Sequence, residues 1–376
     1  MRYFILSGEP SGDLHGSNLV RSLLREDPDA EIACWGGELM EQAGARLLKH
    51  YRDLAFMGVW EVIINLRTVL SNFKTCREQI SGFNPDVVIL IDYPGFNLRI
   101  AKYVKKLGIK VYYYISPKFW AWNESRVNRV KRSVDRMYII FPFEVDFYHR
   151  HGYDAHYIGN PLVDEVENRK SFMPQQNDIL ASLGLGGKPV IALLSGSRKQ
   201  EVVSILPQMV KVIKDFPEYD FVITAVSHIP EKIYKDITGD IPVKIVTGKT
   251  YEILSVAEAA LVTSGTATLE TALFNVPQVV CYCTSALTYQ LSKMVIKVNY
   301  ISLVNLIMNR EIIVELIQKD LNTERLRNEL SYIISGGSKR EKMLDDYSSL
   351  HSILGGPGAS SRIAGDIVKT LNSVKK

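Results

Sequence analysis

The feature that most constrains the fold is an alternation between short β-branched or aromatic runs and amphipathic stretches of helical length. In the first half, the runs "RYFIL", "EIACWGG", "DVVILID" and "KVYYYIS" are separated by such stretches, among them 58–80 and 97–107. This alternation is typical of a parallel sheet wrapped by helices. The pattern starts again at "PVIALLSGS", after a polar stretch at 167–187. We therefore predict an α/β protein with two Rossmann-like, doubly wound halves that meet near 165–185.

Composition limits the classes of function. The 376 residues, 46% of them hydrophobic and 23% charged, can form two domains with buried cores. A net charge of +4 is too small to indicate a nucleic-acid partner. The chain opens on a predicted strand and contains no apolar stretch of spanning length, so we expect neither export nor a membrane-spanning helix. Its cysteines lack CxxC spacing, which favours buried thiols in a reducing compartment; they are Cys34, Cys76, Cys281 and Cys283.

The first predicted strand ends in "SGEPSGDLHG", residues 7–16. Ligands of doubly wound sheets bind beyond the carboxyl ends of the strands, so this turn is a candidate site. Its glycines indicate that something approaches the backbone closely, and we expect a substrate there. The spacing is not GxGxxG, which argues against a dinucleotide. Asp13 is expected either to cap the helix or to touch the substrate, His15 is a candidate base, and Glu9 receives no role. The glycines are Gly8, Gly12 and Gly16.

Two further strand ends in the first half carry unusual side chains. In "ILIDYPGFN", Asp92 directly follows five apolar residues. It is either a helix cap or, as we favour, an active-site acid whose pKa is raised by a half-buried setting. The loop "YYYISPKFWAWNESR" carries Phe119, Trp120 and Trp122. These rings are predicted either to pack against the other domain or to contact a sugar or acyl chain.

Two strand ends in the second half favour anions. In "IALLSGSRKQE", Ser197 precedes Arg198, whose planar guanidinium suits the paired oxygens of a phosphate. In "LVTSGTATLETALFNVP", Gly265 leads into a helix that begins near Thr266, and a helix N-terminus also favours phosphate. Glu270 is placed either to accept hydrogen bonds from a ribose diol or to compensate the helix dipole. Anion sites in one half, with acids and aromatics in the other, indicate a transferase with a nucleotide donor.

The motifs themselves are recognisable. In order and spacing, "GEPSGD", "MGVWEV", "IDYPGFN", "YISPKFWAW", "PFE", "LLSGSR", "SGTATLE" and "VNL" resemble the lipid-A-disaccharide synthases, family 19 glycosyltransferases of Gram-negative bacteria, over almost the whole chain. The resemblance implies a GT-B fold, two Rossmann-like doubly wound domains with the site in an interdomain cleft. Residues 1–165 would form the acceptor and lipid domain, 166–349 would bind the UDP-sugar, and a helix at 350–376 would cross back to the first domain.

The resemblance also implies a reaction. An inverting transfer would join UDP-2,3-diacylglucosamine to 2,3-diacylglucosamine 1-phosphate (lipid X), giving the β(1→6) lipid A disaccharide 1-phosphate and UDP. The alternative is another UDP-sugar enzyme of the same fold, such as a UDP-GlcNAc transferase or a nonhydrolysing epimerase. Our hypothesis makes Asp92 the general base, with Asp13 or His15 as alternates. Substrate-binding residues carried over or inferred are Ser11, Ser197, Arg198, Gly265, Thr266, Glu270 and Asn305.

The sequence departs from the family pattern in places. Gly95 stands where a second carboxylate is frequent, and Ser195 and Val304 stand where proline is commoner. His15 is not a general feature of the family. The sequence 27–29, "DPD", is better interpreted as a turn than as a metal-binding Asp-x-Asp motif. We therefore expect no metal and no other cofactor, with Arg198 and the helix start near Thr266 stabilising the departing UDP.

Acylated substrates require contact with lipid, and two segments are candidates. The stretch 58–74 predicts an apolar helical stripe flanked by Arg67 and Lys74; its residues are Val59, Trp60, Val62, Ile63, Leu66, Val69, Leu70 and Phe73. A basic face is predicted at Arg126, Arg129, Arg132 and Arg136. The alternatives are a core stripe and either a solvated basic face or a site for the acceptor's 1-phosphate. We expect a cytoplasmic protein held peripherally at the anionic inner-membrane surface, and a homodimer is left open.

Overall fold

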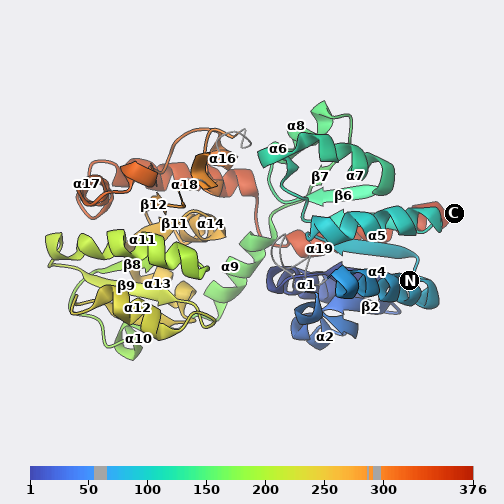
Figure 1. Cartoon of the computed structure of the whole chain (residues 1–376), viewed down its shortest axis with the longest axis horizontal. Helices are drawn as coiled ribbons and strands as arrows, with labels where there is room; N and C mark the ends of the chain where they lie inside the picture. Colours follow the sequence, from blue (N-terminus) through green and yellow to red (C-terminus); the bar gives the residue numbers. More distant parts are fainter. Residues whose placement is uncertain (55–65, 286–287, 291–297, 376) are drawn as a thin grey trace. The chain divides into compact units, whose positions relative to one another are not determined.

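The computed structural model of the chain describes residues 1–54, 66–285, 288–290 and 298–375. The chain divides into two compact units (Figure 1). Unit 1 comprises Met1–Asp164 and Gly356–Lys376, and unit 2 comprises Glu165–Gly355. Each unit has one parallel sheet with helices on its faces. The predicted α/β class with two doubly wound sheets is confirmed.

The sheet of unit 1 has seven strands among the described residues, in the order β3-β2-β1-β4-β5-β6-β7. The strands are β1 (Arg2–Ser7), β2 (Glu31–Gly36), β3 (Arg46–His50), β4 (Val87–Ile91), β5 (Lys110–Tyr114), β6 (Arg136–Ile139) and β7 (His156–Tyr157). The helices are α1 (Pro10–Glu26), α2 (Glu38–Gln42), α4 (Leu66–Phe83), α5 (Pro94–Lys106), α6 (Phe119–Trp122), α7 (Val127–Ser133), α8 (Phe143–Arg150) and α19 (Ala359–Lys375). The boundary between the units falls within α9 (Pro161–Ser171).

The sheet of unit 2 has six strands among the described residues, in the order β10-β9-β8-β11-β12-β13. The strands are β8 (Val190–Leu194), β9 (Asp220–Ala225), β10 (Lys244–Thr247), β11 (Ala257–Thr263), β12 (Gln278–Tyr282) and β13 (Glu315–Ile317). The helices are α10 (Gln176–Ser182), α11 (Lys199–Lys211), α12 (Glu231–Thr238), α13 (Thr250–Val256), α14 (Thr266–Leu273), α16 (Leu303–Met308), α17 (Thr323–Ile333) and α18 (Arg340–Leu354). Single turns of 3-10 helix occur in both units: η1 (Tyr51–Asp53) and η2 (Glu124–Arg126) in unit 1, and η3 (Ile213–Asp215) and η4 (Gln318–Asp320) in unit 2.

The strand order places each candidate site. In both sheets the order reverses beside the first strand of the unit, between β1 and β4 and between β8 and β11. Helices on the two sides of such a point leave on opposite faces, so the strand ends there are open to a ligand. The central strand β4, "VVILI", is buried at every position because both of its faces are covered by helices. Its carboxyl end therefore delivers Asp92 to the reversal point of unit 1.

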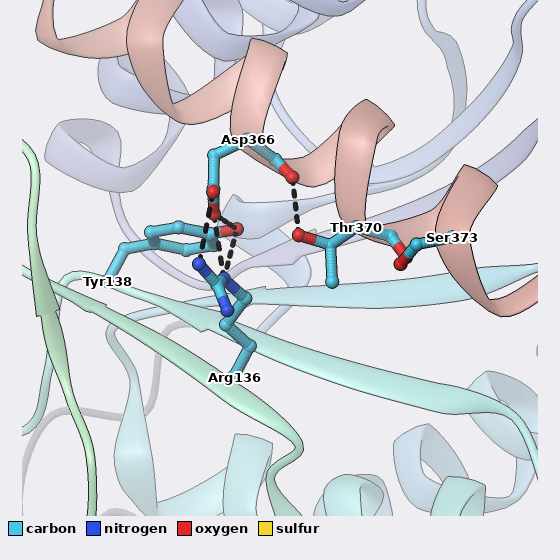
Figure 2. A network of polar contacts seen from close by, with 5 residues as sticks. All are labelled: Arg136, Tyr138, Asp366, Thr370 and Ser373. Carbon is cyan, nitrogen blue, oxygen red and sulfur yellow. Dashed lines mark hydrogen bonds and ion pairs between the residues drawn. The ribbon is translucent and has the colours of Figure 1, made fainter.

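The last helix belongs to unit 1, although it follows all of unit 2 in sequence. Ile363, Ala364, Ile367 and Leu371 of α19 are buried in the same core as the residues of α1. Figure 2 shows the polar contact that accompanies this packing: Asp366 accepts hydrogen bonds from the guanidinium of Arg136 and, at 2.7 Å, from the Tyr138 hydroxyl. Arg136 was predicted to lie on a basic face; it instead begins β6 and forms an ion pair with Asp366 of α19.

Candidate active site

The reversal point of unit 1 brings two carboxylates together. β1 and β4 are parallel neighbours, with Ser7 opposite Ile91, so Glu9 and Asp92 leave adjacent strand ends. Glu9 is the N-cap residue of α1 and is half-buried. Asp92 is also half-buried. Sequence reasoning gave Glu9 no role, because only the strand order places it beside Asp92.

The surroundings of Asp92 oppose its ionisation. Burial, and then the negative charge of Glu9, raise the pKa of Asp92 from its ordinary value of 3.8 to about 6. Lys118 and a hydrogen bond from the Tyr93 backbone favour the charged form, but they do not outweigh the burial. A carboxylate with a pKa near 6 is ionised at neutral pH and still basic enough to take a proton.

The main chain at Asp92 is strained and tightly held. Asp92 and Tyr93 have φ values of 42° and 47°, in the left-handed region that costs non-glycine residues about 1–3 kcal/mol each. The Asp92 carbonyl oxygen accepts hydrogen bonds from Asn97 Nδ2 at 2.7 Å and from the Tyr113 hydroxyl at 2.5 Å. Asn97 Nδ2 also donates to the Ile91 carbonyl, at 3.1 Å. The conformation thus persists because neighbouring side chains fix it.

The glycines of the first loop make room for the protein's own side chains. A Cβ atom on Gly8 would lie 2.5 Å from the Tyr93 ring, and one on Gly16 would lie 2.7 Å from Met40 Sδ. A Cβ atom on Gly12 would lie 2.9 Å from the Ser7 Cβ. The prediction that these glycines admit a substrate is therefore corrected: what approaches the backbone is the packing of unit 1.

The other predicted residues of this loop have different surroundings. The buried Asp13 carboxylate accepts hydrogen bonds from the backbone N–H groups of Gly37, Leu39 and Met40. It thereby caps α2 rather than its own helix, and this leaves it poorly suited to be a base. His15 is half-buried in α1, and Ser11 is exposed in the first turn of that helix.

The aromatic segment after β5 is a short helix, α6, rather than a loop. Phe119 and Trp120 are buried, whereas Trp122 is 43% exposed, with the Arg126 guanidinium above its ring. The buried Glu144 accepts hydrogen bonds from Trp120 Nε1, from Ser116 Oγ and from two backbone N–H groups. Burial raises the pKa of Glu144 to about 7 despite these donors. Glu144 thus fixes the segment from inside the unit, a role that the "PFE" motif alone did not indicate.

The reversal point of unit 2 places two hydroxyls side by side. Ser195 directly follows β8, and Thr263 is the last residue of the paired strand β11. Both residues are buried. Neither hydroxyl has a hydrogen-bond partner among the described residues. Buried hydroxyls are usually satisfied, so this position at the strand ends is suited to a polar ligand. From the sequence, Ser195 is one of the residues that offer a hydroxyl at this strand end, and it is also a departure from the family pattern.

Arg198 lies at the start of α11 with a carboxylate beside it. Its guanidinium forms an ion pair with Glu201, 2.9 Å away, and its side chain is 76% exposed. The Glu201 carboxylate also accepts hydrogen bonds from the backbone N–H groups of Ser197 and Arg198. This is a capping box, and the acid three residues after Arg198 is the sequence signal that could have revealed it. The anion-binding groups predicted here therefore already hold an internal anion.

The start of α14 is open. Gly265 is exposed, with no atom within 4 Å of the position where a Cβ would stand, and Thr266 beside it is also exposed. Glu270, one turn further on, accepts a hydrogen bond from the Tyr251 hydroxyl at 2.8 Å. Burial raises the pKa of Glu270, and Glu165 adds to that effect. The Glu270 carboxylate is thus held by a side chain from α13.

Asn305 has no capacity left for a substrate. Its amide nitrogen donates to the Ile313 carbonyl and to Glu315, and its amide oxygen accepts from the N–H groups of Ile312 and Ile313. The side chain is completely buried and makes the four hydrogen bonds that an amide can make. The predicted substrate contact is therefore corrected to a structural role in the loop before β13.

The residues predicted to contact lipid differ in their exposure, and some of them lie outside the described part of the chain. Val59, Trp60, Val62 and Ile63 lie outside the described residues, as does the side chain of Leu66. Phe73 is buried and its ring stacks on Phe96 with centroids 4.2 Å apart, so it belongs to the core rather than to an exposed stripe. Val69 is half-buried and Leu70 is 58% exposed. Arg129 and Arg132 are exposed on α7, and Arg126 is half-buried.

Comparison with known proteins adds a family and a fold. The family model described as lipid-A-disaccharide synthetase matches residues 3–358. A lipid-A-disaccharide synthase from Syntrophus aciditrophicus is 39% identical over 99% of this chain and 97% of its own length, and one from Geobacter sulfurreducens is 35% identical over 98% and 97%.

Among solved structures, the UDP-GlcNAc 2-epimerase from Neisseria meningitidis, bound to UDP-GlcNAc, has a TM-score of 0.71 at 10% identity, covering 98% of this chain and all of its own. The UDP-GlcNAc 2-epimerase from Methanocaldococcus jannaschii, in complex with UDP-GlcNAc and UDP, has a TM-score of 0.65 at 15% identity, covering 99% of this chain and 100% of its own. At such low identity these likenesses concern the fold alone. They confirm the predicted GT-B fold.

Proposed function

This chain belongs to the lipid-A-disaccharide synthetase family and is a glycosyltransferase of lipid A biosynthesis, and on that premise we propose that Asp92 is its general base. The family reaction joins a UDP-diacylglucosamine donor to lipid X. Asp92 takes the proton from the acceptor's 6-hydroxyl while that oxygen bonds to the anomeric carbon. The bond from the anomeric carbon to UDP breaks, and UDP leaves with the bonding electrons.

One observation carries this assignment. Asp92 is a half-buried carboxylate at the reversal point of the sheet, with a pKa raised to about 6 by burial and by Glu9. Among the alternates, the Asp13 carboxylate already accepts hydrogen bonds from three backbone N–H groups of 37–40, which hold it on the protein's own main chain. His15 lies within α1 and is the remaining rival.

We propose further that unit 2 holds the UDP moiety at its own reversal point. Support comes from the unpartnered hydroxyls of Ser195 and Thr263, the exposed start of α14 at Gly265, and the Arg198 guanidinium. Backbone N–H groups and an arginine can offset the charge that develops on the leaving diphosphate. Glu270, fixed by Tyr251, is the proposed acceptor for the ribose hydroxyls.

The test measures UDP release by the purified full chain with both substrates present. Asp92→Asn is expected to lower kcat by about 10²–10⁴-fold, the usual contribution of a general base, with UDP affinity unchanged. His15→Ala is expected to keep most of the activity. The matched control is Asp146→Asn, which alters an exposed carboxylate of α8. Full activity of Asp92→Asn would remove the assignment, and a greater loss in His15→Ala would transfer it to His15.

We propose that the surface of α4 contacts the anionic inner membrane from the cytoplasmic side. A hollow of about 470 Å³ there is lined by the exposed Leu70 and by Lys74, Arg77 and Arg99, a combination that suits acyl chains beside phosphate groups. Among the described residues, no helix is both long and apolar enough to cross a membrane.

Vesicle binding tests this surface. Leu70→Glu is expected to reduce binding to vesicles that contain anionic phospholipid, and high salt is expected to release the unaltered protein. Leu39→Glu is the matched control, because Leu39 is also exposed, at 37%, but lies on α2. Equal binding of the two variants, or indifference to salt, would count against the proposal.

A further inference from the structure

The strained strand end at Asp92 has a built support. β4 stops at Ile91, and two consecutive left-handed residues then turn the chain into α5, which begins with Pro94. Left-handed conformations of aspartate and tyrosine are unfavourable, so without external contacts this segment would relax. The support therefore has to come from side chains that bond the main chain itself.

Two side chains from different elements hold one atom. Asn97, in the first turns of α5, and Tyr113, in β5, both donate to the carbonyl oxygen of Asp92. Both are completely buried, so water does not compete for these hydrogen bonds. The Asp92 N–H in turn donates to the Tyr114 carbonyl at 3.1 Å. Every polar main-chain atom of Asp92 is thus bonded, while its carboxylate forms no hydrogen bond to a side chain among the described residues.

We propose that Asn97 and Tyr113 are positioning residues for the transfer reaction, because their shared hold on the Asp92 carbonyl fixes the strained turn that keeps the Asp92 carboxylate half-buried. This proposal rests on the proposed role of Asp92 as general base. Neither residue is a catalytic residue, since both act through the main chain. A displacement of about 1 Å at a catalytic group can cost on the order of 10²-fold in rate, so the hold is worth preserving.

The same hold bears on the pH dependence. Burial is the main reason that the pKa of Asp92 is raised, so a turn that relaxes toward water lowers this pKa. Among the described residues, the charged and titratable groups that act on Asp92 are Glu9 from the start of α1, Lys118 from the segment before α6 and Tyr113, while Tyr93 contributes a backbone hydrogen bond. Only Tyr113 of these changes in the central variant, and its hydroxyl bonds the carbonyl rather than the carboxylate.

The central experiment compares Tyr113→Phe with Tyr112→Phe in the full chain. Each variant removes one hydroxyl from a buried tyrosine of β5, but no hydrogen bond joins Tyr112 to Asp92. Tyr113→Phe is expected to lower kcat by about 10- to 100-fold and to move the acidic limb of the kcat–pH profile to lower pH. UDP affinity is expected to remain unchanged, and Tyr112→Phe is expected to change neither quantity.

A second variant tests whether the hold is shared. Asn97→Ala removes the hydrogen bonds that Asn97 Nδ2 donates to the carbonyls of Ile91 and Asp92. The double variant Asn97→Ala, Tyr113→Phe is expected to be little slower than the worse single variant, because both residues act on the Asp92 carbonyl. Multiplying effects would show independent roles and overturn the shared hold. If Asn97→Ala does not fold, Tyr113→Phe alone decides the proposal.

The outcomes separate this proposal from the assignment of the base. Tyr113→Phe with unaltered kcat and acidic limb, beside an inactive Asp92→Asn, overturns the positioning role and leaves the base in place. A loss of kcat with an unmoved limb indicates general destabilisation and also overturns it. Full activity of Asp92→Asn removes the base, and with it the group that Asn97 and Tyr113 would position.

Discussion

Two charged residues that follow central strands, Asp92 after β4 and Arg198 after β8, have opposite environments. Asp92 is half-buried, in a left-handed conformation that other side chains enforce, and the neighbouring carboxylate Glu9 has the same sign. Arg198 is exposed, in an ordinary extended conformation, and the neighbouring Glu201 has the opposite sign. We call the segment that directly follows each strand its exit. The exit of unit 1 therefore opposes a charge on Asp92, whereas at the exit of unit 2 the charge of Arg198 is compensated.

The difference teaches what each exit is suited to do. A base must exchange a proton during each turnover, and a rigid setting that opposes ionisation makes the carboxylate a better proton acceptor. A diphosphate site must release its anion during each turnover. An internal carboxylate such as Glu201 can take over the same hydrogen bonds when the diphosphate has left. The proposed proton acceptor, Asp92, is thus strained and half-buried. The proposed nucleotide contact, Arg198, is exposed and can exchange its partner.

A large effect is expected at the exit of unit 2. Arg198→Ala is predicted to lower kcat/KM for the donor by about 10²–10³-fold, because one donor to the developing charge is lost. Stability should hardly change, since the side chain is 76% exposed. Arg198→Lys is the control and should recover only part of the loss, as a lysine lacks the planar fork. Activity close to normal in Arg198→Ala would break the comparison on this side.

A smaller effect is expected on the stability of unit 1. The folded state binds the Asp92 proton more tightly than the unfolded chain, so the stability from that proton is complete below pH 3.8 and is lost as pH rises through about 6. Asp92→Asn avoids this loss and is predicted to be more stable than the normal chain at neutral pH, by about 1–2 kcal/mol after allowance for solvent screening.

Urea unfolding checks this prediction at about pH 5 and about pH 7.5. The advantage of Asp92→Asn should be larger at the higher pH. Asp146→Asn is the control, because its carboxylate is exposed. An Asp92→Asn variant that is less stable than the normal chain at both pH values would mean that the carboxylate stabilises the turn, and the contrast with Arg198 would then disappear.

Much of the fold could be predicted from the sequence, and the reason is local. The run "VVILI" and its counterparts are apolar on both faces, and this pattern specifies buried parallel strands regardless of the rest of the chain. The charged residues at the strand ends, Asp92 and Arg198, could be selected for the same reason. What the glycines of the first loop admit could not be predicted, because Tyr93 and Met40 reach them from other elements.

The environment of each site residue was not predictable, since it depends on strand order and on side chains far away in sequence. Glu9 and Asp92 are 83 positions apart in the numbering, and only the pairing of β1 with β4 makes them neighbours. Asn305 resembled a substrate contact by its motif, yet the backbone of 312–313 and the Glu315 carboxylate use its amide completely. A motif therefore identifies a residue that matters, but not whether it faces a ligand or the protein.

The internal anion of unit 2 offers a finer test. Glu201→Gln keeps an oxygen that can accept the N–H groups of Ser197 and Arg198 but removes the negative charge. UDP binding, measured by calorimetry, is predicted to tighten by about two- to fivefold, because the diphosphate no longer competes with a carboxylate. The control is Glu252→Gln on α13. Weaker binding of UDP would show that Glu201 orients Arg198 for the ligand instead of occupying its place.

The smallest effect concerns the carboxylate beside Asp92. Glu9→Gln removes a negative charge that helps to raise the pKa of Asp92, so the acidic limb of the kcat–pH profile is predicted to move to lower pH. The rate well above pH 6 should stay within about twofold of normal, since Asp92 is ionised there in both proteins. Glu38→Gln, on α2, serves as the control for loss of an acid in the same unit. Because burial is the larger cause of the raised pKa, the shift from Glu9→Gln should be smaller than the shift from Tyr113→Phe. A limb that moves to higher pH would mean that Glu9 stabilises the ionised form of Asp92, and the two exits would then be alike in compensating their charges.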